Sequence, residues 1–209
     1  MDLNLNQKSI GVFGNHECGK SHFLKKIGSK KNSVVYDPLN EYDSNKFDVW
    51  RPQKTNQEFM EKDVDNFIRD VKDTQQHNKK NNQDMWDFLI FSEASSYLRN
   101  NAYGGNINQF LNYYRHDIDN QGWELGFGYD ARRPAKVSAD LREITKYFAI
   151  FGGIKGANDI KALNQINSGL GNEVKKLDTP FDQNKGNDHT PYQFILVYPD
   201  RSYRKFSPI

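Results

Sequence analysis

The chain has 209 residues, with 29 Lys and Arg, 27 Asp and Glu, and a net charge of +2. This near-neutral charge gives no general argument for nucleic-acid binding, so any DNA contact must come from local patches. The single cysteine, Cys18, excludes an intrachain disulfide and is typical of a reducing compartment.

The length predicts one α/β domain over residues 1–209, with a core at about 9–170 and a C-terminal hairpin at about 190–209. We expect no signal peptide and no membrane-spanning segment. No apolar run approaches the roughly 20 residues that cross a bilayer.

The run Ser9–Phe13 predicts a buried strand, and 21–27 predicts a helix that ends near Gly28. Between them, Gly14–Ser21 fits the phosphate-binding pattern G-x-x-x-x-G-K-[ST] at every fixed position. A glycine-rich turn that fits by chance is the alternative, and the strand–loop–helix context argues against it. The nucleotide-binding residues predicted here are Gly14, Asn15, His16, Glu17, Cys18, Gly19, Lys20, Ser21 and His22.

The chemistry of a triphosphate explains these residue types. Gly14 and Gly19 allow the backbone to turn tightly and to approach a phosphate. The loop N–H groups and the helix N-terminus then form an anion site. Lys20 is expected to contact the β- and γ-phosphates, and the Ser21 hydroxyl to ligate Mg²⁺. The motif therefore predicts binding of ATP with Mg²⁺.

The run 33–37 predicts a second strand, and 48–52 a third. Asp37 and Glu41 follow the second strand at the sheet edge where ligands bind in open α/β folds. Each either holds a magnesium-bound water or positions the attacking water, or else is an ordinary acid that caps a turn. We take Asp37 as a candidate metal-site residue.

Apolar residues at helical spacing predict an amphipathic helix over 56–71. The polar stretch 72–84 follows as a surface connection. Its Gln- and Asn-rich part, 75–83, is interpreted as a solvated loop.

The run Phe88–Phe91 predicts the strand that carries the second phosphate-site motif in ATPases with a phosphate loop of this kind. Asp then Glu usually close this strand, with the Asp supporting Mg²⁺ and the Glu polarising water. Here Ser92 and Glu93 close it. We expect Glu93 to be the catalytic carboxylate and Ser92 to hydrogen-bond a magnesium-bound water. The alternative for Glu93 is a strand-end acid with no catalytic part.

The remaining pattern alternates between helices, strands and turns. We predict a helix from 94 to 100, a flexible segment over 101–106, a helix over 108–117, a strand over 124–130, a short helix over 137–144 capped by Ser138, a strand over 147–151, a helix over 158–170, and a hairpin formed by 192–198 and 201–206.

These pieces, in this order, resemble the FtsK/HerA superfamily of P-loop ATPases, most closely the genome-packaging ATPases of tailless, membrane-containing icosahedral viruses. The resemblance spans about Ser9 to Phe206. It rests on Gly14–Ser21, 34–42, 88–94 and 125–151. Arg132 stands where the family has a polar sensor, usually Gln, and is followed by Arg133-Pro134 and the turn Phe151-Gly152.

The resemblance implies a RecA-like P-loop core: a mostly parallel sheet flanked by helices, with a C-terminal hairpin. It also implies a ring, expected to be a hexamer, that translocates double-stranded DNA by ATP hydrolysis and packages a viral genome into a preformed capsid. The expected partners are DNA phosphates, contacted without sequence preference, and capsid vertex proteins. The location is then the host cytoplasm or the packaging vertex of the virion.

Such a ring implies an arginine that acts on the neighbouring subunit's nucleotide. As the sensor, Arg132 acts either on the γ-phosphate or on a neighbour's nucleotide, and region 99–120 is a candidate pore loop. The arginine candidates are Arg99, Arg115, Arg132, Arg133 and Arg142.

Two other functions remain open from the sequence. One is a filamentous-phage assembly ATPase, which needs a membrane-spanning segment. The other is a small P-loop kinase or nucleotide switch, which needs an arginine-rich lid over a second pocket. Arg132, Arg133 and Arg142 are the lid-like charges.

Overall fold

The structure is a computed structural model that describes residues 3, 5, 8–99, 105–113, 125–179 and 192–207. Its strands form one eight-stranded sheet. The strands are β1 (Ser9–Phe13), β2 (Ser33–Tyr36), β3 (Asp48–Trp50), β4 (Phe88–Phe91), β5 (Gly126–Ala131), β6 (Tyr147–Phe151), β7 (Phe194–Val197) and β8 (Tyr203–Phe206).

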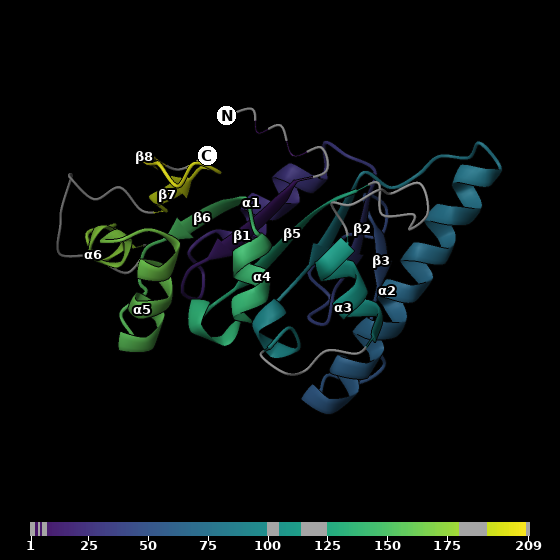
Figure 1. Ribbon diagram of the computed structural model, residues 1–209, viewed down its shortest axis with the longest axis horizontal. Helices are drawn as coiled ribbons and strands as arrows, with labels where there is room; N and C mark the ends of the chain where they lie inside the picture. The colour runs from purple at the N-terminus through teal and green to yellow at the C-terminus, as the bar shows by residue number, and fades with distance from the viewer. Residues whose placement is uncertain are drawn as a thin grey trace.

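The sheet order is β3-β2-β4-β5-β1-β6-β7-β8 (Figure 1). The six strands from β3 to β6 pair in parallel, while β7 and β8 add antiparallel partners at one edge. The mostly parallel sheet and the C-terminal hairpin confirm the predicted fold class. The carboxyl ends of the parallel strands meet at a single edge, which is where ligands bind in this kind of sheet.

Helices cover both faces of the sheet, as the two buried apolar clusters show. One cluster joins Phe23 and Leu24 of the first helix to one face. The other joins the remaining helices to the opposite face. These helices are α1 (Lys20–Gly28), α2 (Gln57–Lys80), α3 (Gly105–Tyr113), α4 (Ala139–Ile144), α5 (Ala157–Ile166) and α6 (Leu170–Lys175), with 3₁₀ turns η1 (Ala94–Ser96) and η2 (Pro134–Lys136).

The long helix α2 runs beside β3 at one end of the sheet, away from the β7–β8 hairpin (Figure 1). Asn56 caps its start by accepting a hydrogen bond from the Phe59 N–H. The predicted helix end at 71 and the solvated loop over 75–83 are wrong, because α2 continues to Lys80. Gln75 extends its buried stripe, and its amide pairs with both the N–H and the C=O of Trp86.

Other helix boundaries also differ from the sequence prediction. The helix predicted from 94 is only the 3₁₀ turn η1, so Arg99 lies beyond it. Helix α3 begins at Gly105, earlier than predicted. The helix predicted over 158–170 ends earlier, as α5 at Ile166, because Asn167 is extended. A further helix, α6, follows the left-handed Gly169 (φ 84°) and lies almost wholly beyond the predicted range. Residues 101–104 and 114–124, including Arg115 and most of the candidate pore loop, lie outside the described residues.

The predicted short helix after the Arg-Pro pair is confirmed as α4. Ser138 caps it by accepting a hydrogen bond from the Leu141 N–H. Within the described ranges, none of the helices has the length and apolar character needed to span a bilayer.

Candidate active site

The predicted phosphate loop connects β1 to α1. Gly19 adopts a left-handed conformation, with φ 99°, and forms the N-cap of α1 without a side-chain cap. A Cβ at Gly14 would collide with Cys18 Sγ and Phe151 Cβ. Both glycines are therefore required by the loop geometry. The result is an uncapped helix N-terminus, which is a favourable site for a phosphate group.

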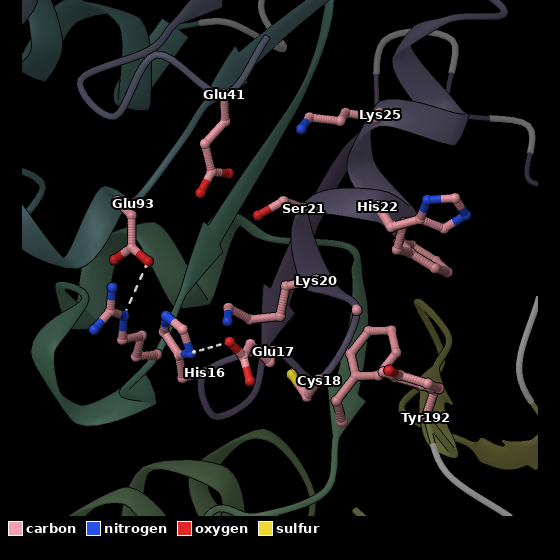
Figure 2. Close-up of a pocket in the computed structure, with 14 residues that line it drawn as sticks. His16, Glu17, Cys18, Lys20, Ser21, His22, Lys25, Glu41, Glu93 and Tyr192 are labelled. Carbon is pink, nitrogen blue, oxygen red and sulfur yellow. Dashed lines mark hydrogen bonds and ion pairs between the residues drawn. The ribbon is translucent and has the colours of Figure 1, made fainter. Parts of the chain in front are cut away.

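Lys20 is held against its own loop. Its Nζ donates a 2.8 Å hydrogen bond to the Asn15 carbonyl, and the residue is 6% exposed. The ammonium group is thus fixed where the loop turns, within a large cavity (Figure 2).

This cavity has a volume of about 890 Å³. Of the predicted nucleotide-binding residues, 16–22 line it, while Gly14 and Asn15 shape the loop behind it. Burial raises the pKa of the Cys18 thiol, which lies against Gly14. The cavity is lined by His16, Glu17, Cys18, Gly19, Lys20, Ser21, His22, Phe23, Lys25, Glu41, Glu93, Arg132, Phe151 and Tyr192.

Glu93 lies across the cavity from the loop, with its carboxylate facing the same space as Lys20 and Ser21 (Figure 2). It is the second residue after β4 and has a left-handed backbone, with φ 51°. Arg132, which follows β5, donates from Nε to Glu93 Oε1 at 3.1 Å. The structure therefore brings together the three residues predicted as catalytic: Lys20, Glu93 and Arg132.

The two acids that follow β2, Asp37 and Glu41, have different surroundings in the structure. Asp37 is buried and accepts hydrogen bonds from the N–H groups of Glu41 and Tyr42, at 3.1 and 2.9 Å, so it caps this turn. Asp37 is not among the residues that line the cavity. Glu41 does line it, with its carboxylate directed towards Ser21 and Glu93 (Figure 2).

Asp130, which the sequence analysis did not single out, does not line the cavity but contacts Glu93, which does. It lies on β5 and is 1% exposed, and its Oδ1 accepts a 3.0 Å hydrogen bond from the Glu93 N–H. Burial raises the pKa of its carboxyl group to about 7, although the charge of Lys20 acts to lower it. An acid near the end of a buried strand was the available signal, and it is the same signal that singled out Glu93.

The predicted arginines have different surroundings. Arg142 donates to the carbonyls of Pro134 and Val137, so its guanidinium group is held by backbone atoms of its own subunit. Arg133 pairs with the buried carboxylate of Asp159 at 3.1 Å. Arg115 lies outside the described residues. Arg99 donates from Nε to the Ser95 carbonyl.

A second cavity, of about 340 Å³, shares Glu93 and Arg132 with the first. Four basic side chains line it, and Glu93 is the acid among its lining residues. The lining residues are Leu39, Glu93, Ser95, Ser96, Arg99, Arg132, Arg133 and Lys136.

Solved structures share this arrangement of strands and helices. The genome-packaging NTPase B204 of Sulfolobus turreted icosahedral virus 2, in complex with ATP-γS, aligns over 99% of this chain and all of its own, with a TM-score of 0.69 and 16% identity. The DNA-packaging ATPase B204 of Sulfolobus turreted icosahedral virus aligns over 98% and 99%, with a TM-score of 0.70 and 16% identity. This chain has the B204 fold.

The conjugation coupling protein TcpA of pCW3, solved with ATPγS, is a more distant match to the B204 fold seen here. It aligns over 99% of this chain and 62% of its own length, with a TM-score of 0.56 and 11% identity. No protein-family model and no curated protein sequence matches the chain, so the comparison rests on structure.

Proposed function

We propose that this chain is an ATPase that drives the packaging of double-stranded DNA. One observation carries the proposal: Lys20 of the phosphate loop and Glu93 line the same cavity from opposite sides. A triphosphate on the loop would then have its γ-phosphate between a fixed ammonium and a carboxylate. B204, which shares the fold, is described as a DNA-packaging ATPase and was solved with ATP analogues.

In this proposal, the loop N–H groups and the N-terminus of α1 bind the phosphates. Lys20 exchanges the Asn15 carbonyl for phosphate oxygens. Glu93 accepts a proton from the attacking water, and Arg132 fixes the orientation of its carboxylate. Arg132 is also positioned to respond to charge that develops on the γ-phosphate.

The oxygen donors in the cavity fit Mg²⁺, a hard cation that keeps several waters and takes few protein ligands. The Ser21 hydroxyl would bind it directly, as predicted. Glu41 replaces Asp37 as the acid of the β2 turn that faces it, because Asp37 is occupied by the backbone. The ion supplies charge neutralisation to the phosphates when bound.

The wider function completes the proposal. The chain forms a ring, proposed to be a hexamer, that contacts DNA phosphates without reading sequence. It acts with capsid vertex proteins, in the host cytoplasm or at the packaging vertex of the virion.

The test is the rate of ATP hydrolysis by the purified protein with and without double-stranded DNA at low salt. We expect DNA to stimulate hydrolysis and added salt to remove the stimulation, since phosphate contacts are salt-dependent. The same hydrolysis rate with and without DNA would contradict the motor function.

The second cavity favours one other candidate, a small P-loop kinase. Its four cations lie next to Glu93, where a second phosphate-bearing substrate would fit. Transfer of the γ-phosphate to a nucleoside monophosphate, assayed directly, would support the kinase. Release of inorganic phosphate alone would support the motor.

A further inference from the structure

Three buried polar residues lie side by side at the carboxyl ends of neighbouring strands. Tyr36, Phe91 and Tyr129 are in register across β2, β4 and β5. The residues that follow them are Asp37, Ser92 and Asp130, and each is at most 1% exposed. Burial of three polar side chains in one row is costly unless each one finds a partner.

The hydrogen bonds of this row are incomplete. Asp37 uses both oxygens to cap the β2 turn. Asp130 uses Oδ1 to hold the Glu93 N–H, but its Oδ2 has no partner within the described residues, and neither does Ser92 Oγ. Asp130 Oδ2 and Ser92 Oγ occupy neighbouring positions across β4 and β5 and do not bond to each other, so both require an explanation, and a water that donates hydrogen bonds provides one.

The charges around Asp130 indicate where that water belongs. Lys20, Glu93 and Glu41 all influence its carboxyl group electrostatically, and all three line the nucleotide cavity. Asp130 and Ser92 do not themselves line that cavity, but both adjoin Glu93, which does: Ser92 precedes it in the chain and Asp130 holds its N–H. A cation-bound water donates hydrogen bonds and needs acceptors in its second coordination shell.

We infer that Asp130 supplies the acid that position 92 lacks. In the B204-fold ATPase proposed above, on which this inference rests, Asp130 Oδ2 and Ser92 Oγ together bind a water of the nucleotide's Mg²⁺. Asp130 Oδ1 meanwhile holds the backbone of Glu93. The acid that supports the cation lies on β5 instead of β4, and a single side chain links the cation to the catalytic carboxylate.

The test uses a fluorescent, non-hydrolysable ATP analogue, titrated with Mg²⁺ and with EDTA. Wild-type protein should bind it more tightly with Mg²⁺. Asp130→Asn keeps the shape of the side chain and an oxygen for the Glu93 N–H, but it removes the charge. It should lose about tenfold or more of the Mg²⁺-dependent gain in affinity while affinity in EDTA is unchanged.

The decisive variant returns the acid to β4. Ser92→Asp combined with Asp130→Asn should recover most of the lost Mg²⁺ dependence, because the carboxylate is restored on the neighbouring strand. A loss in Asp130→Asn that the double variant does not recover would contradict the inference. So would a full Mg²⁺ effect in Asp130→Asn.

A variant and a control guard against effects of folding. Ser92→Ala removes one unsatisfied hydroxyl, so it should weaken the Mg²⁺ effect without loss of thermal stability. An unchanged Mg²⁺ effect in Ser92→Ala would count against the inference even if Asp130→Asn fails to fold. Asp65→Asn is the control, because Asp65 also accepts backbone N–H bonds but from Asn106 and Ile107 on α3. It should keep the full Mg²⁺ effect.

Failure of the inference is distinguishable from failure of the proposed function. Wild-type protein that does not bind the analogue in either condition would overturn the ATPase itself. Wild-type protein that binds with Mg²⁺ dependence, alongside an unaffected Asp130→Asn, would overturn only the role of Asp130.

Discussion

Glu93 is held at both ends. Its backbone N–H bonds to Asp130 and its carboxylate pairs with Arg132. With 13% of its side chain exposed, the carboxylate reaches the cavity but is shielded from most of the solvent. A carboxylate fixed in this way is oriented before the substrate arrives, which is the geometry that general-base chemistry requires.

We therefore expect Glu93→Gln to bind ATP normally and to lower turnover by at least about 100-fold, since an amide cannot accept the proton. Nucleotide affinity and hydrolysis rate should be measured separately on the same preparation. Near-normal turnover would remove Glu93 from the catalytic role.

Lys20→Ala should lower nucleotide affinity by about tenfold or more, because the phosphates lose a charged hydrogen-bond donor. Lys26→Ala is the matched control on the same helix, since Lys26 is exposed and does not line the cavity. Equal affinities of the two variants would show that the charge of Lys20 is not used.

At this scale, the sequence predicted the residues that belong to a recognisable motif. Lys20, Ser21 and Glu93 lie where the pattern places them. It did not predict Asp130, because no motif marks that position and its role depends on the neighbour across the sheet. It also could not separate Glu41 from Asp37, since the turn that decides between them is a local hydrogen-bond arrangement.

At the scale of elements, the strands were easier to predict than the helix ends. Buried strands of a parallel sheet are near-continuous apolar runs, and β4 and β6 are of this kind, while β1 is mostly apolar after Ser9. The predicted end of helix α2 was too early because its buried stripe continues through Gln75, a polar residue. The Gln75 amide takes the place of backbone partners for Trp86.

Gln75→Leu should accordingly destabilise the fold by about 1–3 kcal/mol, because both backbone groups of Trp86 lose a partner that leucine cannot replace. Chemical denaturation of the wild-type protein, of Gln75→Leu and of a control variant measures this change in the free energy of unfolding. Gln83→Leu, at an exposed position after α2, should change the free energy of unfolding by less than about 0.5 kcal/mol. A neutral Gln75→Leu would mean that water substitutes for the amide.

At the scale of the whole molecule, the arginines bear on how the proposed ring is built. In a ring, the surface around one subunit's site meets a different surface of its neighbour. Arg99, Arg132 and Arg133 line the cavity that shares Glu93 with the nucleotide cavity. They belong to the surface that carries the chain's own site, so we expect them to act within their own subunit.

Mixing two inactive variants tests this expectation. If Arg132 acts within its own subunit, a mixture of Lys20→Ala and Arg132→Ala chains contains no complete site, and ATPase activity should stay at the level of the separate variants. If Arg132 acts on a neighbour, sites formed between the two kinds of chain would be complete. Recovery of activity on mixing would therefore contradict our expectation.

The left-handed backbone of Glu93 has a thermodynamic consequence. A long side chain disfavours this conformation, whereas asparagine adopts it more readily. Among catalytically dead variants, Glu93→Asn should thus be more stable than Glu93→Gln, by up to about 1 kcal/mol, in a thermal melt without nucleotide. If Glu93 is the catalytic carboxylate, as proposed, its chemistry is retained here at some cost in the free energy of unfolding.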